Sequence, residues 1–471
     1  MAGALAACID NGVRVAVLKV GSSEAGGRAA AAHTGAIAGD QRVFRALVEE
    51  AGAAWAADPH ELLELARVLA VRRADPRTDR GPGSGPAILT CSGGDSGNAA
   101  DLAEENGIDL PELAPHTIER LTELLPEAAT PGNPLDYTSL LWFETGVLTE
   151  IVAVVGRDPS VDQLLLFHDH PRDLRPEHDS EWADVRRALA AGAVESGAPA
   201  LFSSTLPDLV DEDAIIELGE IDVPVVGGMA AAISVVRASR RPTPSVERLE
   251  RIAKVASGIP EEPGDWLGEA ASKELLRKHG IAVPEGGTAM DTAAALEVAG
   301  RVGWPVALKL SAPGIRHKSE SKAMTLDVSD GDQLIREVVR LFALPTANGA
   351  TLLVERMLDP GLELIVSAAA DSVVPTLVVG LGGIWTELIG DAAVIPLPAG
   401  PEQIQEALLG LKAAPLLTGA RGTDPVDLEA LADLAAKVGR ILIEEKLSLI
   451  ELNPVIVSTK GAVATDAIAR N

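Results

Sequence analysis

Short apolar runs alternate with segments of helical periodicity through the first 240 residues of the chain. The runs that predict buried strands lie at 15–20, 87–91, 163–167, 200–202 and 224–226. Helical patterns separate them, including segments near 40–51 and 59–70. Strand–helix alternation of this kind predicts parallel sheets in a doubly wound arrangement.

The pattern changes from Trp266 onward. A helix at 272–280 is followed by predicted strands at 305–310, 352–355, 362–368, 375–380, 449–457 and 462–466. The pair 362–368 and 375–380 is close together in the sequence, which favours an antiparallel arrangement. Two segments rich in Gly and Pro, 71–85 and 241–265, indicate boundaries between domains.

Composition and charge argue against some classes of binding partner. Hydrophobic residues make up 47% of the 471 residues and aromatic residues only 3%, so Ala, Val, Leu and Ile must form the cores. With 40 basic and 69 acidic residues the formal charge is −29, which argues against nucleic acid and anionic membranes as partners. The two cysteines offer no disulfide framework, and no apolar stretch is long enough to span a bilayer, so we expect a cytoplasmic protein.

Residues suited to binding a nucleoside triphosphate occur in the C-terminal third of the sequence. Lys309 closes an apolar strand, and its ammonium can be aimed at a phosphate from a rigid position. Glu355 ends another strand, where it could contact adenine and ribose. The run 380–383, which includes Gly382 and Gly383, offers backbone N–H groups for phosphates. Asn453 and Asp466 bring oxygen atoms to neighbouring strand ends, and Mg²⁺ takes one or two such ligands from protein.

Residues 266–471 resemble the ATP-grasp domain of the NDP-forming acyl-CoA synthetases, relatives of succinyl-CoA synthetase. The resemblance is carried by the runs SKELLRKHGIAVP, GWPVALKLSAPGIRHKSE, GLELIVSAAAD, VVGLGGIWTELIGD, PLLTGARGTDPVD and IELNPVIV. It implies that Lys309 contacts the nucleotide phosphates, that Glu355 lies at the adenine–ribose end, and that Asn453 and Asp466 carry Mg²⁺. It further implies that Glu363 and Glu387 are pocket carboxylates.

His317 matches a histidine that the ADP-forming branch of this family uses to relay phosphate to the nucleotide. The family usually continues with an acidic residue, a small residue and two glycines, whereas this chain has Glu320-Ser321-Lys322-Ala323. The missing glycines remove backbone freedom near the phosphates. Two interpretations of His317 stay open, a phosphate relay and a polar loop histidine.

His33 lies among small residues, in the run AAAAHTGAIAGD. Thr34 and Gly35 stand just before a predicted helix, whose N-terminal N–H groups favour an anion. Residue chemistry alone favours a plain loop histidine. Residues 18–70, however, closely resemble the phosphohistidine domain of the same family. The resemblance implies that His33 is the phosphorylated residue.

The middle third, 86–240, resembles the family's second flavodoxin-like domain, and its motif Asn133-Pro134-Leu135-Asp136 also matches. Gly93 and Gly94 lie in Ser-Gly-Gly-Asp between a strand and a helix, where N–H groups can hold a phosphate or a carboxylate. The alternative is a tight strand–helix turn. In Phe167-His168-Asp169-His170 two histidines flank an aspartate, but no third metal ligand is evident, so a loop or part of the acid pocket is favoured over a metal site.

The family normally begins with a Rossmann-like CoA-binding domain, and this sequence contains no G-x-G-x-x-G motif in a βαβ setting. A start codon placed too late, a separate CoA-binding subunit, and a decayed or repurposed protein are the three explanations. Homo-oligomer formation is also expected from the family's tendency to assemble.

The sequence therefore predicts an α/β protein with two flavodoxin-like doubly wound parallel-sheet domains followed by an ATP-grasp domain. The expected parts are a phosphohistidine domain (1–80), a second ligase domain (86–240), a linker (241–265) and the ATP-grasp domain (266–471). The resemblance implies an ADP-forming acid–CoA ligase that uses ATP, Mg²⁺ and CoA to activate a carboxylic acid through phosphohistidine. The alternative is a catalytically incomplete subunit, or a regulatory ATP-binding protein, that needs a CoA-binding partner.

Overall fold

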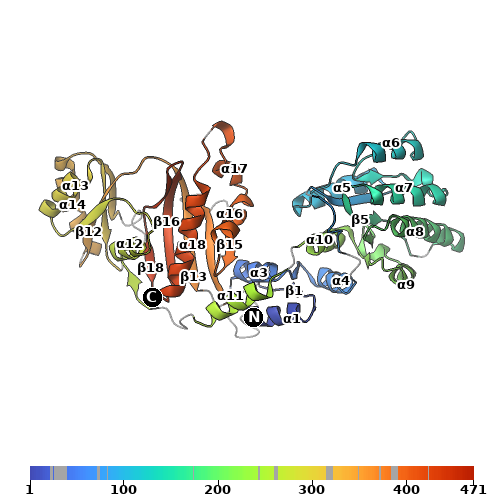
Figure 1. Cartoon of the computed structure of the whole chain (residues 1–471), viewed down its shortest axis with the longest axis horizontal. Helices are drawn as coiled ribbons and strands as arrows, with labels where there is room; N and C mark the ends of the chain where they lie inside the picture. The colour runs from blue at the N-terminus through green and yellow to red at the C-terminus, as the bar shows by residue number, and fades with distance from the viewer. Residues whose placement is uncertain are drawn as a thin grey trace. The chain divides into compact units, whose positions relative to one another are not determined.

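The structure is a computed structural model. It describes residues 1–21, 25, 40–71, 75–81, 83–172, 174–241, 244–258, 264–313, 322–347, 349–370, 373–382, 391–422 and 424–471. Within these residues the chain divides into two compact units (Figure 1). The N-terminal unit comprises 7–27 and 51–245, and the C-terminal unit comprises 1–6, 28–50 and 246–471.

A five-stranded parallel sheet forms the centre of the N-terminal unit, in the order β4-β3-β5-β6-β7. Its strands are β3 (Gly85–Thr90), β4 (Leu135–Asp136), β5 (Val161–Phe167), β6 (Ala200–Ser203) and β7 (Val225–Val226). Two further strands, β1 (Ala16–Leu18) and β2 (Ala54–Ala56), pair in parallel with each other.

Helices cover both faces of this sheet because successive side chains of each strand point to opposite sides. Leu89 and Leu164 belong to one core cluster, while their neighbours Ile88 and Leu165 belong to the other. The first core includes α6 (Pro115–Leu124), α7 (Thr145–Arg157), α8 (Pro176–Ser196) and α9 (Glu212–Glu220). The second includes α4 (Pro59–Leu69), α5 (Gly93–Glu105) and α10 (Met229–Ser239). The short helices η2 (Ser139–Leu141) and η3 (Pro207–Leu209) lie in loops. The predicted doubly wound parallel arrangement is confirmed.

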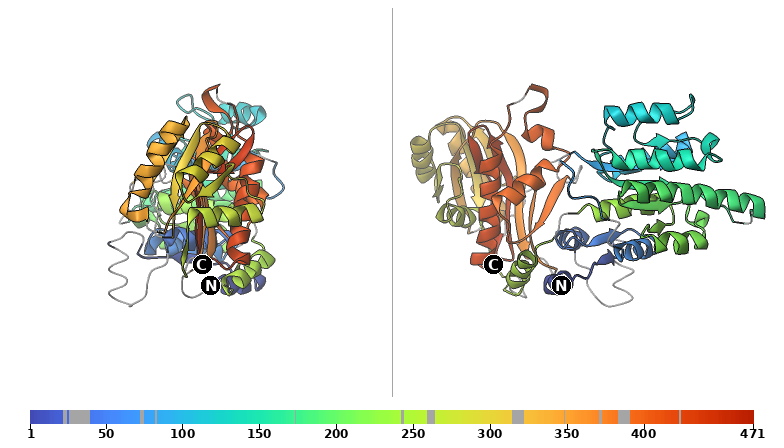
Figure 2. Two further views of the ribbon diagram at one scale, coloured as in Figure 1. Left: turned by 90° about the vertical axis from the view of Figure 1, so that its left-hand side faces the viewer. Right: turned by 45° about the vertical axis from the view of Figure 1, so that its right-hand side comes forward.

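Two antiparallel sheets form the C-terminal unit (Figures 1 and 2). The smaller has the order β11-β10-β12-β9, with β9 (Gly286–Ala289), β10 (Val306–Ser311), β11 (Met324–Val328) and β12 (Thr351–Arg356). The larger has the order β15-β14-β13-β16-β18-β8, with β17 paired to β16. Its strands are β8 (Trp266–Leu267), β13 (Leu362–Ala370), β14 (Pro375–Leu381), β15 (Ala392–Pro396), β16 (Leu449–Ser458), β17 (Gly461–Ala464) and β18 (Ile468–Arg470). The predicted antiparallel pairing of β13 with β14 is confirmed.

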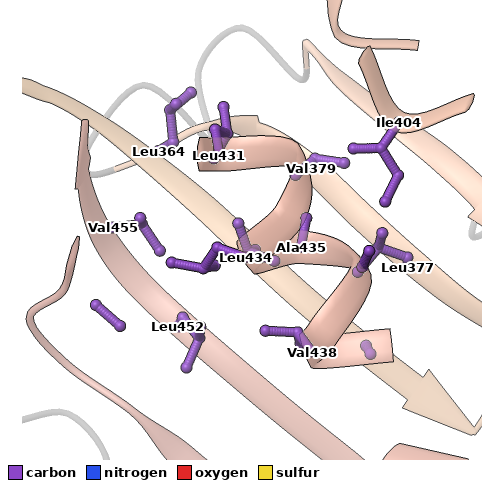
Figure 3. Close-up of a cluster of buried hydrophobic side chains, with 14 of the residues drawn as sticks. Leu364, Leu377, Val379, Ile404, Leu431, Leu434, Ala435, Val438, Leu452 and Val455 are labelled. Carbon is purple, nitrogen blue, oxygen red and sulfur yellow. The ribbon is translucent and has the colours of Figure 1, made fainter. Parts of the chain in front are cut away.

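Each antiparallel sheet has its own apolar core. Helices α13 (Thr292–Val302) and α14 (Gly331–Phe342) share a core with the smaller sheet, while α12 (Glu269–Lys278), α16 (Pro401–Leu409), α17 (Ala414–Leu417) and α18 (Leu428–Glu444) share one with the larger. Leu431, Leu434, Ala435 and Val438 of α18 recur at helical spacing and face the sheet (Figure 3). The short helices η4 (Pro345–Ala347) and η5 (Ala420–Gly422) complete this unit.

Helix α3 (Gln41–Glu50) belongs to the C-terminal unit, although its sequence lies in the first 50 residues. It packs on β15, and α11 (Val246–Ala256) lies against β14 of the same sheet. The first residues of α1 (Ala2–Asp10) also belong to this unit. The predicted domain boundaries at 80, 86, 240 and 266 stay predictions. Among the described helices, none combines the length and apolar character needed to cross a bilayer.

Candidate active site

Four charged side chains meet inside the C-terminal unit and form what we call the charge cluster: Glu269, Lys273, Lys309 and Glu355. Each is at most 6% exposed. The Lys273 Nζ lies 2.7 Å from Glu269 Oε1 and 2.6 Å from Glu355 Oε1. The Lys309 Nζ lies 3.0 Å from Glu269 Oε1 and 3.1 Å from Glu355 Oε2. The two positive and two negative charges are thus arranged so that each lysine contacts both carboxylates.

The fold explains why these side chains meet. Lys309 and Glu355 lie on β10 and β12, whose antiparallel register pairs Ala307 with Glu355 and Lys309 with Leu353. Glu269 and Lys273 are one helical turn apart on α12, so they share one face of that helix. The start of α12 is fixed to the end of β10, because Ala270 N donates to the Ser311 hydroxyl at 2.9 Å.

The loop before β18 completes the cluster. The Thr465 carbonyl accepts hydrogen bonds from both Lys273 Nζ (2.6 Å) and Lys309 Nζ (2.5 Å). Burial alone lowers the pKa of Lys309, but the negative charges of Glu269, Glu355 and Asp466 outweigh it and raise that pKa. Burial and the nearby Lys309 charge lower the pKa of Lys273. Lys309 is therefore held as a cation by the surrounding negative charges.

Asn453 and Asp466, the predicted Mg²⁺ ligands, lie on segments joined by hydrogen bonds. The Pro454 carbonyl accepts from Thr465 N at 3.1 Å and from the Thr465 hydroxyl at 2.9 Å. The Asp466 Oδ1 accepts from Ala467 N at 2.8 Å. A carboxylate and an amide oxygen are ligand types that Mg²⁺ accepts from protein, with water and phosphate completing its coordination. The assignment of Mg²⁺ to Asn453 and Asp466 stays a prediction. No group of three or more His, Cys, Asp or Glu suited to a metal occurs among the described residues.

Glu363 and Gly382 lie together at the ends of β13 and β14. Glu363 is exposed, and its backbone carbonyl accepts from Gly382 N at 2.9 Å. A Cβ at position 382 would come within 2.8 Å of the Leu364 carbonyl carbon, so the close approach of the two strands requires glycine there. Gly383 and Glu387 lie outside the described residues.

The two predicted catalytic histidines, His33 and His317, also lie outside the described residues, as do Thr34 and Gly35. The helix that follows His33 in the sequence, α3, is described, and it packs on β15.

Gly93 and Gly94 begin α5 in the N-terminal unit, and both are exposed. The Ser92 hydroxyl caps this helix by accepting from Asp95 N at 3.4 Å. A Cβ on Gly93 would come within 3.4 Å of Asp136 Oδ2, so the loop lies beside the Asn-Pro-Leu-Asp motif. Burial, together with the charges of Asp169 and Asp136, raises the pKa of Asp95. The two glycines of the loop are exposed, and the Asp136 carboxylate lies beside them.

His168 and His170 contact residues of α8 and thereby support the fold. The ring of His168 is buried, and its Nε2 lies 3.1 Å from the Trp182 carbonyl. Burial lowers the pKa of His168 to about 3, so this ring is neutral at physiological pH. His170 Nε2 lies 2.8 Å from Asp179 Oδ1, and its Nδ1 lies 3.2 Å from Arg186 Nη1. These contacts link β5 to α8.

Sequence reasoning missed Glu269, Lys273 and the Thr465 carbonyl. The signal available was an acidic and a basic residue four apart on α12, which is ordinarily a surface ion pair. Their burial becomes visible only in the structure, where the start of α12 lies beside the end of β10 and Lys273 contacts Glu355 of β12.

Comparison with known proteins agrees with the geometry. Residues 259–470 match the family model described as an ATP-grasp domain, and residues 2–69 match the succinyl-CoA ligase like flavodoxin domain. The predicted fold class, with flavodoxin-like parallel sheets and an ATP-grasp domain, is therefore confirmed.

Several relatives share long stretches with this chain. An acetate–CoA ligase (ADP-forming) I from Archaeoglobus fulgidus is 28% identical over 463 residues, which cover 96% of this chain and 65% of the relative. The β subunit of acetate–CoA ligase (ADP-forming) I from Pyrococcus furiosus is 34% identical over 229 residues, which cover 46% of this chain and 98% of that subunit. This chain thus spans about two thirds of the Archaeoglobus relative's length.

A solved structure of a dinucleotide-forming acetyl-coenzyme A synthetase 1 from Ca. Korarchaeum cryptofilum, in complex with coenzyme A, Ca-AMPCP and HgCl+, is 30% identical. The match covers 44% of this chain and 93% of that chain, with a TM-score of 0.41.

Proposed function

This chain belongs to the family of ADP-forming acetate–CoA ligases, and from that membership we propose that it is an ATP-dependent acid–thiol ligase. The proposed reaction converts a carboxylic acid, CoA and ATP to acyl-CoA, ADP and phosphate. The observation that carries the proposal is the buried charge cluster, in which Glu269 and Glu355 hold Lys309 as a cation.

The proposed steps pass one phosphoryl group through the protein. The imidazole of His33 takes the γ-phosphoryl group of ATP, and ADP leaves. A carboxylate oxygen of the acid then attacks that phosphorus, which gives an acyl phosphate and frees His33. The CoA thiol attacks the acyl carbon, loses its proton and releases phosphate.

The residues of the C-terminal unit would bind and orient the nucleotide. Lys309 would neutralise charge on the phosphates, and Glu363 would be a pocket carboxylate. Glu355, whose buried carboxylate contacts both Lys273 and Lys309, would hold Lys309 in place. Gly382, Gly383 and Glu387 complete this proposed pocket. Asn453 and Asp466 would hold Mg²⁺, which supplies further charge neutralisation at the phosphates when bound.

Helix α3 supports a role for His33 near this pocket. α3 follows the His33 segment in the sequence and packs on β15, which in turn follows the Gly383–Glu387 segment. Arg248 on α11 ties the two together, because its Nε donates to Glu50 Oε1 at 2.9 Å and its Nη2 to the Pro396 carbonyl at 2.6 Å. Helix α3 is thus anchored to the sheet that bears the proposed metal ligands.

CoA and the acid complete the proposed set of substrates, with Gly93 and Gly94 proposed to bind the acid or the phosphoryl group. The Pyrococcus relative is named as a β subunit, which supports testing a CoA-binding partner subunit alongside homo-oligomers of this chain. A cytoplasmic location, where ATP and CoA are available, belongs to the same proposal.

Transfer of ³²P from γ-labelled ATP tests the proposal directly. The purified chain with Mg²⁺ is expected to acquire label that is labile in acid and stable in base, as for phosphohistidine. His33→Ala should abolish the label. His116→Ala, which changes an exposed histidine on α6, is the matched control and should leave it unchanged. Binding of ATP with no acid-labile label on the wild-type chain would refute the ligase assignment.

A further inference from the structure

Lys273 contacts both carboxylates of the charge cluster and is wholly buried. We propose that Lys273 is a positioning residue that neutralises Glu269 and Glu355, so that the Lys309 ammonium is released toward the nucleotide phosphates. This inference rests on the proposed function, in which Lys309 binds those phosphates.

The contacts distinguish the two lysines. Lys273 Nζ lies 2.6 and 2.7 Å from the two oxygens of Glu355, and 2.7 Å from Glu269 Oε1. The corresponding Lys309 contacts are longer, at 3.0 and 3.1 Å. Lys273 is 0% exposed, whereas Lys309 retains 6% exposure. Lys273 is therefore the inner counter-ion, and Lys309 is the more exposed of the two lysines, which favours Lys309 as the one that meets an incoming anion.

The energetics follow from desolvation. A buried carboxylate that loses its only partner is strongly destabilised, because water does not replace the lost contact. If Lys309 were the only cation beside Glu269 and Glu355, turning its ammonium to a phosphate would leave both carboxylates without a positive charge to neutralise them. With Lys273 in place, both carboxylates and the Thr465 carbonyl keep a cationic partner when Lys309 moves.

Lys273 also fixes the segment that bears a proposed metal ligand. Its bond to the Thr465 carbonyl, at 2.6 Å, holds the residue just before Asp466. The side chain on α12 thereby links the phosphate-binding lysine of β10 with the acidic end of the loop before β18. The role is indirect, because Lys273 is wholly buried and contacts Glu269, Glu355 and the Thr465 carbonyl.

Binding of MgATP should therefore follow the net charge of the cluster. Lys273→Met leaves one positive charge against two negative charges and is expected to weaken binding by at least about tenfold, or about 1.4 kcal/mol. Glu269→Gln leaves two positive charges against one and is expected to tighten binding. The double variant Lys273→Met/Glu269→Gln is expected to recover most of the lost affinity, a rescue that a merely structural role of Lys273 would not produce.

Isothermal titration of the full-length chain with MgATP measures these affinities, and circular dichroism establishes that each variant is folded. Lys278→Met is the matched control, because Lys278 lies on the same helix but is exposed and contacts Glu445. It should bind MgATP as the wild type does. If Lys273→Met does not fold, Lys273→Arg, which should keep the affinity, and Glu269→Gln remain as tests.

Two results would overturn the inference: a folded Lys273→Met chain with wild-type affinity, or a Glu269→Gln chain weakened as much as Lys309→Ala. Lys309→Ala separates this inference from the proposed function. Wild-type affinity in Lys309→Ala contradicts the proposed nucleotide site itself. Weak binding in Lys309→Ala, with wild-type binding in Lys273→Met, contradicts only the role of Lys273.

Discussion

At the scale of single residues, Asn453 is the simplest test of the proposed metal site. Asn453→Ala removes one oxygen ligand without removing the Pro454 carbonyl that holds Thr465. We expect the Mg²⁺ concentration that half-saturates ATP binding to rise about tenfold or more. This concentration is measured by following ATP binding at increasing Mg²⁺ concentrations. Asn453→Asp keeps an oxygen and should retain the Mg²⁺ response, and an unchanged requirement in Asn453→Ala would remove Asn453 from the site.

His317 presents a choice between relay and loop residue. The departure from the family pattern at Glu320-Ser321-Lys322-Ala323 favours a chain in which His33 takes phosphate directly from the nucleotide. His317→Ala should therefore leave measurable acid-labile ³²P on His33. Complete loss of label in a folded His317→Ala chain would show that His317 is an obligatory relay.

Some residues of the candidate site could be predicted from the sequence and others could not. The sequence predicts Lys309 and Glu355 because each follows an apolar run and because their order and spacing resemble the ATP-grasp domain of the family. Glu269 and Lys273 were missed because charged residues four apart on an amphipathic helix ordinarily face water. Their burial depends on contacts of the first turns of α12 with the end of β10 and with Glu355 of β12. These strands are distant from α12 in the sequence, and no local pattern encodes such contacts.

At the scale of elements, α3 also shows that a local sequence pattern does not predict long-range packing. Its apolar residues Val43, Leu47 and Val48 predict a helix with one buried face, but they do not say which sheet covers that face. In the structure α3 packs on β15, which lies more than 340 residues further along the sequence. Strands such as β15 and β18 were not predicted, because short strands in an antiparallel sheet have too few residues for a clear alternation.

Arg248 is expected to hold α3 in place. Its guanidinium contacts Glu50, Gln403 and the carbonyls of Pro396 and Pro398. Removing one partner of a buried ion pair costs about 3 kcal/mol, so Arg248→Met should accelerate amide exchange in Gln41–Glu50 by roughly a hundredfold. Hydrogen exchange with mass spectrometry measures this. Arg251→Met, an exposed position on the same helix, is the control, and equal effects of both variants would contradict the anchor.

In the N-terminal unit, Asp158 between α7 and β5 should make the stability of the fold depend on pH. Its carboxylate accepts from Ala114 N at 2.8 Å, from Ser160 N at 2.8 Å and from the Ser160 hydroxyl at 2.6 Å. Burial alone raises the pKa of Asp158, but hydrogen bonds from Ser160, Thr117 and Ala114 outweigh it and lower that pKa below its ordinary 3.8. The ionised form is therefore the one that stabilises the fold.

Since the pKa is lower in the folded state, this stabilisation is complete above about pH 4 and is lost as the pH falls through the folded-state pKa. Asp158→Asn should lower the free energy of unfolding by about 1–3 kcal/mol at pH 7. Urea unfolding of wild type and variant at pH 7 and at pH 3 measures the difference. It should shrink at pH 3, and a difference independent of pH would contradict the assignment.

At the scale of the whole molecule, the two units should respond differently to nucleotide. All four residues of the charge cluster, with Thr465 and Asp466, lie in the C-terminal unit. A ligand that binds only the folded state stabilises it by about 2.7 kcal/mol at a concentration of 100 times Kd. MgATP at that level should slow exchange in β10, β12 and β16 by roughly a hundredfold where exchange requires unfolding of that unit.

The strands β3, β5 and β6 of the N-terminal unit should keep their exchange rates, since they contribute no residue to the proposed nucleotide pocket. Hydrogen exchange of the full chain with and without MgATP measures both sets in one sample. In Lys309→Ala the protection of the C-terminal unit should largely disappear at the same nucleotide concentration. Equal protection of β5 and β10 by MgATP would mean that nucleotide binding involves both units, and the charge cluster alone would then not explain how ATP is held.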